Sequence, residues 1–414
     1  MHKDSGKCLD LFLRVDERPR TFRPGTWIFG QEYRYQTEYF KGAPFLLEYI
    51  PILINSGGPR EAFEVYRKPN VERDGHKGGG ATGQIRHEAD LMSFFIGMDS
   101  ENPEELNADM SYHMGLRDNE VVYDFDKSSC VFIPRGICNG PQVFSNLKRT
   151  VMFLNIFTQP SKEACYIEHI YHGLPTAKKE ELTESQLREY AASNPEMYKE
   201  RFGEEPSFPD QTPLTELYPD NAAVLTKREG VFGQADVSST LSYGAENFKD
   251  APYHVNITYI KGNTILMPGT DKGEEKPVWK DDAMFNGYNG PYPQYCMEAD
   301  RYVFFFGTNV KDLKELGGHV KCMIGDDLRD AEETFEFDEP KCVYIPQGVR
   351  FGPVDVSGFK QDIVMVDVIV APTMKAAKVV PDFTYFSEFH DQEKRKRLDA
   401  GKGSPAKMKK ADKK

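Results

Sequence analysis

The stretch Cys130-Val-Phe-Ile-Pro-Arg-Gly136, which continues to Gly140-Pro141, decides how this chain is organised, because it occurs twice. It returns as Cys342-Val-Tyr-Ile-Pro-Gln-Gly348, which continues to Gly352-Pro353, at an offset of 212 residues (342 minus 130). In each copy an apolar, β-branched run ends at a proline, and a glycine follows two positions later, which is typical of a strand and a tight turn. Internal similarity of this kind indicates a duplicated unit.

Three further blocks recur in the same order ahead of this one. They are Phe29-Gly30-Gln31 and Phe232-Gly233-Gln234, the runs Phe40 to Phe45 and Phe248 to Tyr253, and Glu88-Ala89-Asp90 with Gly97 and Glu298-Ala299-Asp300 with Gly307. The offset grows from 203 (232 minus 29) to 212 along the chain, as expected if loops gained residues while strands kept their register. The sequence therefore predicts two related halves.

Length and composition favour two β-rich domains. A chain of 414 residues is too long for one ordinary core, and its 27 Pro, 34 Gly and 12% aromatic residues accompany many short apolar runs. We expect an N-terminal domain over 1–160, a mostly helical linker over 161–222, a C-terminal domain over 223–375, and an extension over 376–414 that ends in a disordered basic tail. The expected fold class is all-β dominated.

Charge and cysteine usage limit the partners. The formal charge of −13 opposes nucleic-acid binding, and no apolar run has the length of a membrane span. The seven cysteines are scattered without a CxxC pair, which indicates reduced thiols. With no signal-peptide core near the N-terminus, we expect a soluble, cytoplasmic protein with a small-molecule ligand. A homo-oligomer is compatible with the sequence.

The repeated block, downstream of an acidic motif that ends in glycine, resembles the two sequence motifs of the cupin superfamily. The first cupin motif places His residues and a Glu on one strand, and the second reads Pro-x-Gly-x-x-His. The chain is similar to duplicated cupins, or bicupins, whose first motif reads His-Glu-x-Asp. This resemblance implies two small antiparallel β-barrels or jelly rolls, each with its ligand or metal in the barrel mouth.

The two halves depart from these motifs unequally. At the second-motif His, the chain has Asn139 in the first half and Phe351 in the second, and at the first-motif His it has His87 and Met297. The family's metal site has three His and one carboxylate, so the second barrel is expected to be metal-free and structural. The first barrel is expected to have the more polar interior and to carry the function.

His87, Glu88 and Asp90 form the candidate catalytic and metal-binding cluster. On a regular strand, residues 88 and 90 share a face that 87 does not, so a bulge is needed for all three to meet at one ion. Alternatively, Glu88 and Asp90 form salt bridges at the barrel rim. His76, in a glycine-rich loop, is the candidate additional ligand, unless this loop is merely a flexible surface segment. The expected cofactor is one divalent ion, Mn, Fe, Zn or Ni.

Four more residues are candidates for substrate binding: Tyr112, His113, Arg135 and Asn139. Arg135 suits an anionic ligand group, unless it simply faces solvent. Glu168-His169-Ile-Tyr-His172 is a weaker metal candidate, because a His pair three residues apart fits one face of a helix but is common at surfaces.

These residues predict an enzyme that acts on a small polar organic substrate in the first barrel. Acid/base or metal-assisted hydrolysis, lyase chemistry or isomerisation would suit carboxylates beside an imidazole. The alternative is a non-catalytic, ligand-binding or structural bicupin. A metal-dependent dioxygenase is less favoured, because the three-His set is missing.

Overall fold

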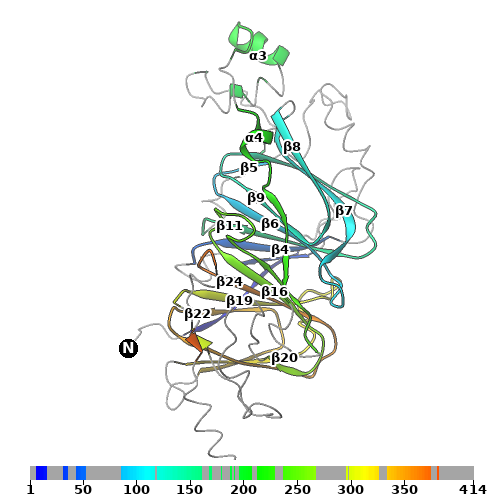
Figure 1. Ribbon diagram of the computed structural model, residues 1–414, viewed down its shortest axis with the longest axis vertical. Helices are drawn as coiled ribbons and strands as arrows, with labels where there is room; N and C mark the ends of the chain where they lie inside the picture. The colour runs from blue at the N-terminus through cyan, green and yellow to red at the C-terminus, as the bar shows by residue number, and fades with distance from the viewer. Residues whose placement is uncertain are drawn as a thin grey trace, which may run out of the picture.

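The computed structural model describes the parts of the chain that form two antiparallel β domains and a short helical connection. The described residues are 6–15, 31–35, 43–52, 85–116, 119–160, 167–169, 179, 187–188, 191, 195–207, 212–228, 236–266, 295–296, 298–325, 333–373 and 380–381. The two domains are stacked along the long axis of the molecule (Figure 1). The expected all-β architecture, with two antiparallel β domains, is confirmed.

The first domain consists of two sheets that face each other. The larger has the order β13-β9-β6-β11-β4-β3-β2, and the smaller β12-β5-β10-β7-β8. The larger comprises Phe12–Val15 (β2), Gln31–Tyr35 (β3), Leu46–Ile52 (β4), Leu91–Gly97 (β6), Ser129–Ile133 (β9), Val151–Phe157 (β11) and Ala222–Val224 (β13). The smaller comprises Ile85–His87 (β5), Glu105–Leu116 (β7), Asn119–Lys127 (β8), Cys138–Ser145 (β10) and Ile167–His169 (β12).

The second domain repeats this plan. Its larger sheet has the order β1-β22-β19-β24-β16-β15-β14, and its smaller sheet β21-β20-β23-β18-β25, with β17 also paired to β23. The larger comprises Lys7–Asp10 (β1), Thr226–Arg228 (β14), Thr240–Tyr243 (β15), His254–Ile260 (β16), Arg301–Gly307 (β19), Lys341–Ile345 (β22) and Ile363–Ile369 (β24). The smaller comprises Thr264–Leu266 (β17), Tyr295–Cys296 (β18), His319–Gly325 (β20), Glu333–Phe337 (β21), Arg350–Ser357 (β23) and Val380–Pro381 (β25).

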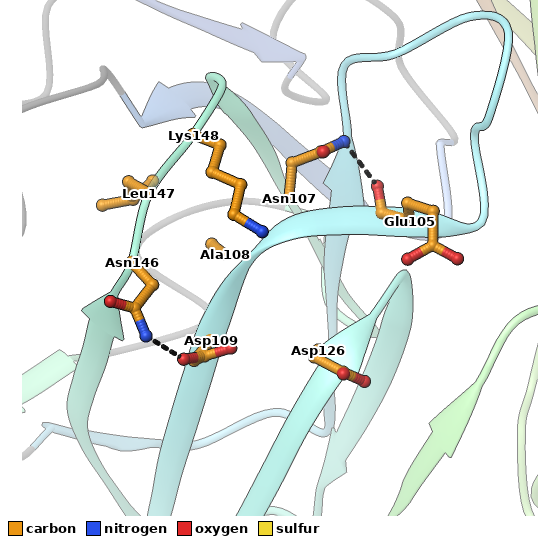
Figure 2. Close-up of a pocket in the computed structure, with 8 residues that line it drawn as sticks. All are labelled: Glu105, Asn107, Ala108, Asp109, Asp126, Asn146, Leu147 and Lys148. Atoms are coloured by element: carbon orange, nitrogen blue, oxygen red, sulfur yellow. Dashed lines mark hydrogen bonds between the residues drawn. The ribbon is translucent and has the colours of Figure 1, made fainter.

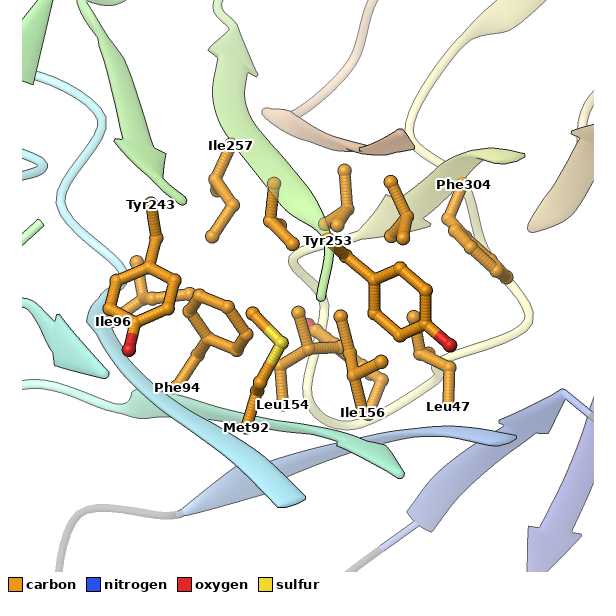
Figure 3. Packing of buried hydrophobic residues seen from close by; sticks show 14 of the residues in the cluster. Leu47, Met92, Phe94, Ile96, Leu154, Ile156, Tyr243, Tyr253, Ile257 and Phe304 are labelled. Carbon is orange, nitrogen blue, oxygen red and sulfur yellow. The ribbon is translucent and has the colours of Figure 1, made fainter. Parts of the chain in front are cut away.

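The two larger sheets pack against each other and build one apolar core between the domains. Because side chains alternate along a strand, each of these sheets sends one set of residues into this shared core and the other into its own barrel. Figure 3 shows the first set, with Leu47, Met92 and Leu154 from one sheet beneath Tyr243 and Ile257 from the other. Burial of this many aliphatic and aromatic groups stabilises the pair of domains as one unit.

Reciprocal contacts relate the two halves as a pseudo-twofold pair. The Tyr49 hydroxyl donates to the Gly307 carbonyl oxygen (3.4 Å), and the Tyr259 hydroxyl donates to the equivalent oxygen of Gly97 (2.9 Å). Tyr49 also stacks on Phe306, with ring centroids 4.4 Å apart. The expected facing arrangement of the duplicated halves is therefore present.

The chain crosses between the domains at the start of each half. Strand β1 pairs with β22 of the second domain, and after Leu11 the chain enters β2, which pairs with β3 of the first. Likewise β13 pairs with β9 of the first domain, and after Leu225 the chain enters β14 of the second. Leu11 and Leu225 both pack on the shared core, so each half contributes an edge strand to the other. The boundaries expected at 160, 222 and 375 stay a prediction.

Two helices are described between the halves. Pro195–Phe202 forms α3 and Leu214–Leu217 forms α4, which lies against β8. The Leu214 N–H donates to Asn119 Oδ1 (2.7 Å), and the Tyr123 hydroxyl donates to the Tyr218 carbonyl oxygen (2.6 Å). Neither of these helices, nor any other in the described residues, has the length and apolar character required to span a membrane.

Candidate functional site

The acidic residues of the repeated motif lie at a turn on the barrel rim. Asp90 Oδ1 accepts the Arg135 backbone N–H at 2.7 Å, and Asp300 Oδ1 accepts the Gln347 N–H at 2.8 Å in the second half. An aspartate therefore closes the same turn in both domains, which explains why it recurs. Its catalytic and metal-binding roles stay a prediction.

Glu88 and Arg135 meet on the outside of this turn. Glu88 Oε2 lies 3.2 Å from Arg135 Nη2, and the two side chains are 39% and 66% exposed. Such an exposed pair contributes at most about 1 kcal/mol to stability. In this arrangement both groups face solvent, as in the rim salt bridge considered as the alternative.

Three of the candidate residues face the interior of the first barrel. His87 is buried and packs edge-on against the Phe157 ring, with centroids 5.0 Å apart. Tyr112 and Asn139 lie on neighbouring strands of the smaller sheet, and the Tyr112 hydroxyl donates to Asn139 Oδ1 at 3.0 Å. These three predicted site residues therefore lie where a ligand inside the barrel could meet them.

His113 lies on the opposite face of β7 from Tyr112. Tyr112 belongs to the barrel core, whereas His113 Nδ1 lies 2.7 Å from Glu120 Oε1 on the outer face. Alternation along a regular strand causes this separation. A ligand in the barrel would meet Tyr112 from inside, so the two neighbours cannot contact it together.

Two of the candidate metal ligands cannot be placed. His76 and His172 lie outside the described residues, and His169 lies on strand β12. The expectation that His169 and His172 share one face of a helix is therefore wrong for His169, which lies on a strand. Within the described residues, no three His, Cys, Asp or Glu side chains gather in a group that could hold a metal ion. The described part of the predicted ligand set does not fit a metal centre, and the ion stays a prediction that depends on His76.

A row of polar residues that the sequence analysis missed crosses the larger sheet of the first barrel. Asn155 on β11 is in register with Glu48 on β4 and with Ser93 on β6. Their apolar neighbours two residues away, such as Ile50, Phe95 and Phe153, belong to the barrel core, so these polar residues also face the interior. All three are buried, and the Ser93 hydroxyl donates to Asn155 Oδ1 at 2.8 Å.

Tyr112 connects this row to the smaller sheet. Burial raises the pKa of the Tyr112 hydroxyl well above its usual range, although hydrogen bonding to the Gln142 and Ser93 side chains acts in the opposite direction. The hydroxyl therefore stays protonated at neutral pH and acts as a donor. We call Glu48, Ser93, Asn155 and Tyr112 the first-barrel belt. One polar residue within each otherwise apolar run, 45–53, 91–96 and 151–157, was the sequence signal.

The equivalent row in the second barrel is also polar. Asp367 on β24 is in register with Asn256 on β16, which is in register with Ser242 on β15. The Ser242 hydroxyl donates to Asn256 Oδ1 at 2.6 Å, and His254 Nε2 lies 3.1 Å from the same oxygen. Arg301 donates to both Asp367 oxygens, at 3.2 and 2.6 Å.

We call Ser242, His254, Asn256, Arg301 and Asp367 the second-barrel belt. Arg301 and Asp367 are only 3% and 6% exposed, so the second interior holds a buried ion pair. Among the described residues both interiors are polar, so the expectation that the first barrel has the more polar one stays a prediction. Met297 and Phe351 stand where the first half has His87 and Asn139, but Arg301 stands where the first half has Leu91.

The buried imidazole of His254 should make the stability of the protein depend on pH. Burial lowers the pKa of His254, against the opposing effect of the Glu246 carboxylate, while Arg228 lowers it further and Asn256 and Asp367 raise it. In the unfolded chain His254 takes up a proton near pH 6.5, whereas in the folded protein it does so only at lower pH. The free energy of unfolding therefore falls as the pH drops below about 6.5. Relative to His254→Leu, the native protein should lose up to about 1.4 kcal/mol per pH unit between pH 6.5 and 5.

Urea unfolding of both proteins at several pH values between 8 and 5 measures this difference. Leu46 stands at the equivalent position of the first barrel, which indicates that leucine fits there. Parallel pH profiles of the two proteins would show that His254 does not titrate differently on folding.

A described pocket of about 400 Å³ lies on the outer side of β7 and β8 (Figure 2). Its lining residues are Glu105, Asn107, Ala108, Asp109, Asp126, Asn146, Leu147 and Lys148. Asn146 donates to the Asp109 carboxylate, and Lys127 pairs with Glu105. None of the candidate site residues lines this pocket, and two of its carboxylates already have partners.

Comparison with known proteins gives structural likenesses only. No protein-family model and no curated protein matches the chain. One structure of oxalate decarboxylase from Bacillus subtilis is 9% identical with a TM-score of 0.49, and covers 96% of this chain and 84% of its own. Another is 10% identical with a TM-score of 0.47, covering 91% and 79%. Oxalate decarboxylase from Lactobacillus farciminis, in a formate complex, is 11% identical with a TM-score of 0.45, covering 94% and 91%.

Proposed function

We propose that the first barrel binds a small polar organic molecule between its two sheets and acts on it by acid/base chemistry. The first-barrel belt is the observation that supports this proposal. It places a carboxylate, an amide and two hydroxyls inside a shell of Phe95, Phe144 and Phe153. Burying polar groups costs free energy unless they are hydrogen-bonded, and groups with a strongly shifted pKa, such as Tyr112, cluster at functional sites.

Each member of the set has a role that follows from its chemistry. The Tyr112 hydroxyl, protonated at neutral pH and held by Asn139, would donate a hydrogen bond or a proton to a substrate oxygen. Ser93 and Asn155 hold each other and would orient the substrate through their remaining hydrogen-bonding capacity. Glu48 would accept a proton that leaves the substrate. His87, which lies beside Phe157, would then carry this proton towards the barrel mouth.

Hydrolysis, lyase-type cleavage and isomerisation all suit such a set, because each requires one proton donor and one acceptor near a reacting bond. Glu88, Asp90, His113 and Arg135 play no part in this route, since their described contacts lie outside the interior. A divalent ion held with His76 would add Lewis-acid chemistry, but no step described above requires it.

The alternative is a non-catalytic barrel, and one observation favours it. Ser93 with Asn155 and Tyr112 with Asn139 form mutual pairs, as in a polar network that only fixes the packing of a core. The two functions differ in the effect of removing a single hydroxyl. If the network only supports packing, its removal lowers the stability of the protein, whereas if the network is catalytic, its removal lowers the turnover rate.

The substitution Tyr112→Phe tests the proposal, with Tyr259→Phe as its matched control. Both tyrosines are fully buried and donate one hydrogen bond, but Tyr259 donates to Gly97 between the domains. We expect Tyr112→Phe to lower kcat/KM about 100-fold, a typical loss for one acid/base group, and Tyr259→Phe to change it less than about threefold.

Turnover is measured by NMR on a panel of small hydroxy acids, keto acids and dicarboxylic acids, oxalate included. Equal losses in the two variants would contradict a role for the Tyr112 hydroxyl in chemistry. If the native protein converts no member of the panel, the non-catalytic alternative is preferred.

A further inference from the structure

The duplication supplies an internal control for the second-barrel belt. Register pairing makes His254 equivalent to Leu46, Arg301 to Leu91 and Asp367 to Asn155. The same sheet therefore folds in the first barrel with two leucines and an amide at these places. The fold itself does not require the charges or the imidazole.

Burying an ion pair where a leucine and an amide also fit costs free energy. Replacing such a pair by hydrophobic groups of similar size is often neutral or stabilising, because two charges no longer have to leave water. Arg301 and Asp367 are nevertheless present, and the Arg301 guanidinium lies 5.0 Å from the centre of the Phe351 ring on the opposite sheet. Stability alone therefore does not explain the ion pair.

A second observation points towards a ligand. His254 has no exposed surface, and its Nδ1 makes no hydrogen bond among the described residues, with Glu246 Oε1 3.4 Å away. Ser242 and Asp367 use only part of the hydrogen-bonding capacity of a hydroxyl and a carboxylate. These three groups surround the half-buried Asn256, so the belt can take additional partners.

The row that contains the belt also includes residues that solvent reaches. Thr226, at the edge of the sheet, is exposed and in register with the fully buried Ser242, and the row continues through Asn256 to Asp367. Exposure along this row is uneven, because Ser242 is fully buried and Asp367 is buried, whereas Asn256 between them is half-buried. A small molecule would reach the belt from solvent at Asn256.

The chemistry of the belt indicates the class of ligand. Arg301 and Asp367 neutralise each other, so a charged ligand would be desolvated there without a counter-charge. Hydroxyl, amide, imidazole and carboxylate groups in one row match ligand hydroxyls, which both donate and accept hydrogen bonds. We infer that the second barrel is a separate binding site for a small, neutral, polyhydroxylated molecule.

The double substitution Arg301→Leu/Asp367→Asn in the full-length protein tests this inference. It installs the residues of the first barrel at both positions and leaves no buried charge alone. The probes are D-glucose, D-mannose, D-galactose and myo-inositol, each titrated and followed by saturation-transfer NMR. We expect at least one probe to bind the native protein and to bind the double variant at least tenfold more weakly, with a Tm within about 3 °C of the native value.

Three results would overturn the inference. They are that no probe binds the native protein, that the double variant binds equally well, or that its Tm falls by more than about 10 °C, which would show a structural pair. Tyr259→Phe, between the domains, should leave probe binding unchanged. The double substitution changes no residue of the first-barrel belt, so its outcome is independent of the function proposed for the first barrel.

Discussion

The single substitution Arg301→Leu should destabilise the protein by about 3–5 kcal/mol, the usual cost of leaving one member of a buried ion pair without the other. Asp367 would then keep a carboxylate that is 8% exposed and has lost both hydrogen bonds from the guanidinium. The contact of Arg301 with the Phe351 ring would be lost as well. Urea unfolding at pH 7 measures the change in the free energy of unfolding.

Arg135→Leu is the matched control for this substitution. Arg135 Nη2 lies 3.2 Å from Glu88 Oε2 and both side chains are exposed, so the loss should stay below about 1 kcal/mol. A loss as small for Arg301→Leu would show that water reaches Asp367 in the folded protein. It would also remove the argument that the ion pair is costly to keep.

Much of the fold could be predicted from the sequence because the duplication preserved residues that the backbone requires. The repeated Pro-x-Gly turns and the repeated Asp90 and Asp300 are such residues, and each makes the same contact in both halves. The exchange of β1 and β13 between the domains could not be predicted. Lys7–Asp10 and Ala222–Val224 share no motif, and only tertiary packing determines which sheet edge each one joins.

The candidate site was predicted in part, for a physical reason. Motif positions led to His87 and Asn139, which face the interior, but motif spacing alone could not show that Asp90 is occupied by the turn. Glu48 was missed because it has no counterpart in the family motifs. A charged residue within an apolar strand was the informative feature, since burial of a carboxylate is rare without a partner or a function.

Gly97→Ala should be among the most destabilising single-methyl changes in the chain. A Cβ at position 97 would lie 1.8 Å from the Glu105 carbonyl oxygen, a backbone atom that cannot rotate away. Position 307 repeats this geometry, with a Cβ 1.9 Å from the Glu315 carbonyl oxygen. Relief requires the strand end to shift, and Gly97 and Gly307 also accept the hydrogen bonds from Tyr259 and Tyr49.

Each of the two alanine variants should therefore lose about 3 kcal/mol or more, the upper range for overpacking, because a shift disturbs both the barrel and the interface between the domains. Gly136→Ala is the control, because a Cβ at position 136 would meet open space. The alanine would only have to adopt the positive φ of 79°, which costs about 1 kcal/mol. Unfolding in urea, followed by tryptophan fluorescence and circular dichroism, compares the three variants. Losses of similar size at 97, 307 and 136 would mean that backbone conformation, and not the close approach of Glu105 and Glu315, explains why the motif ends in glycine.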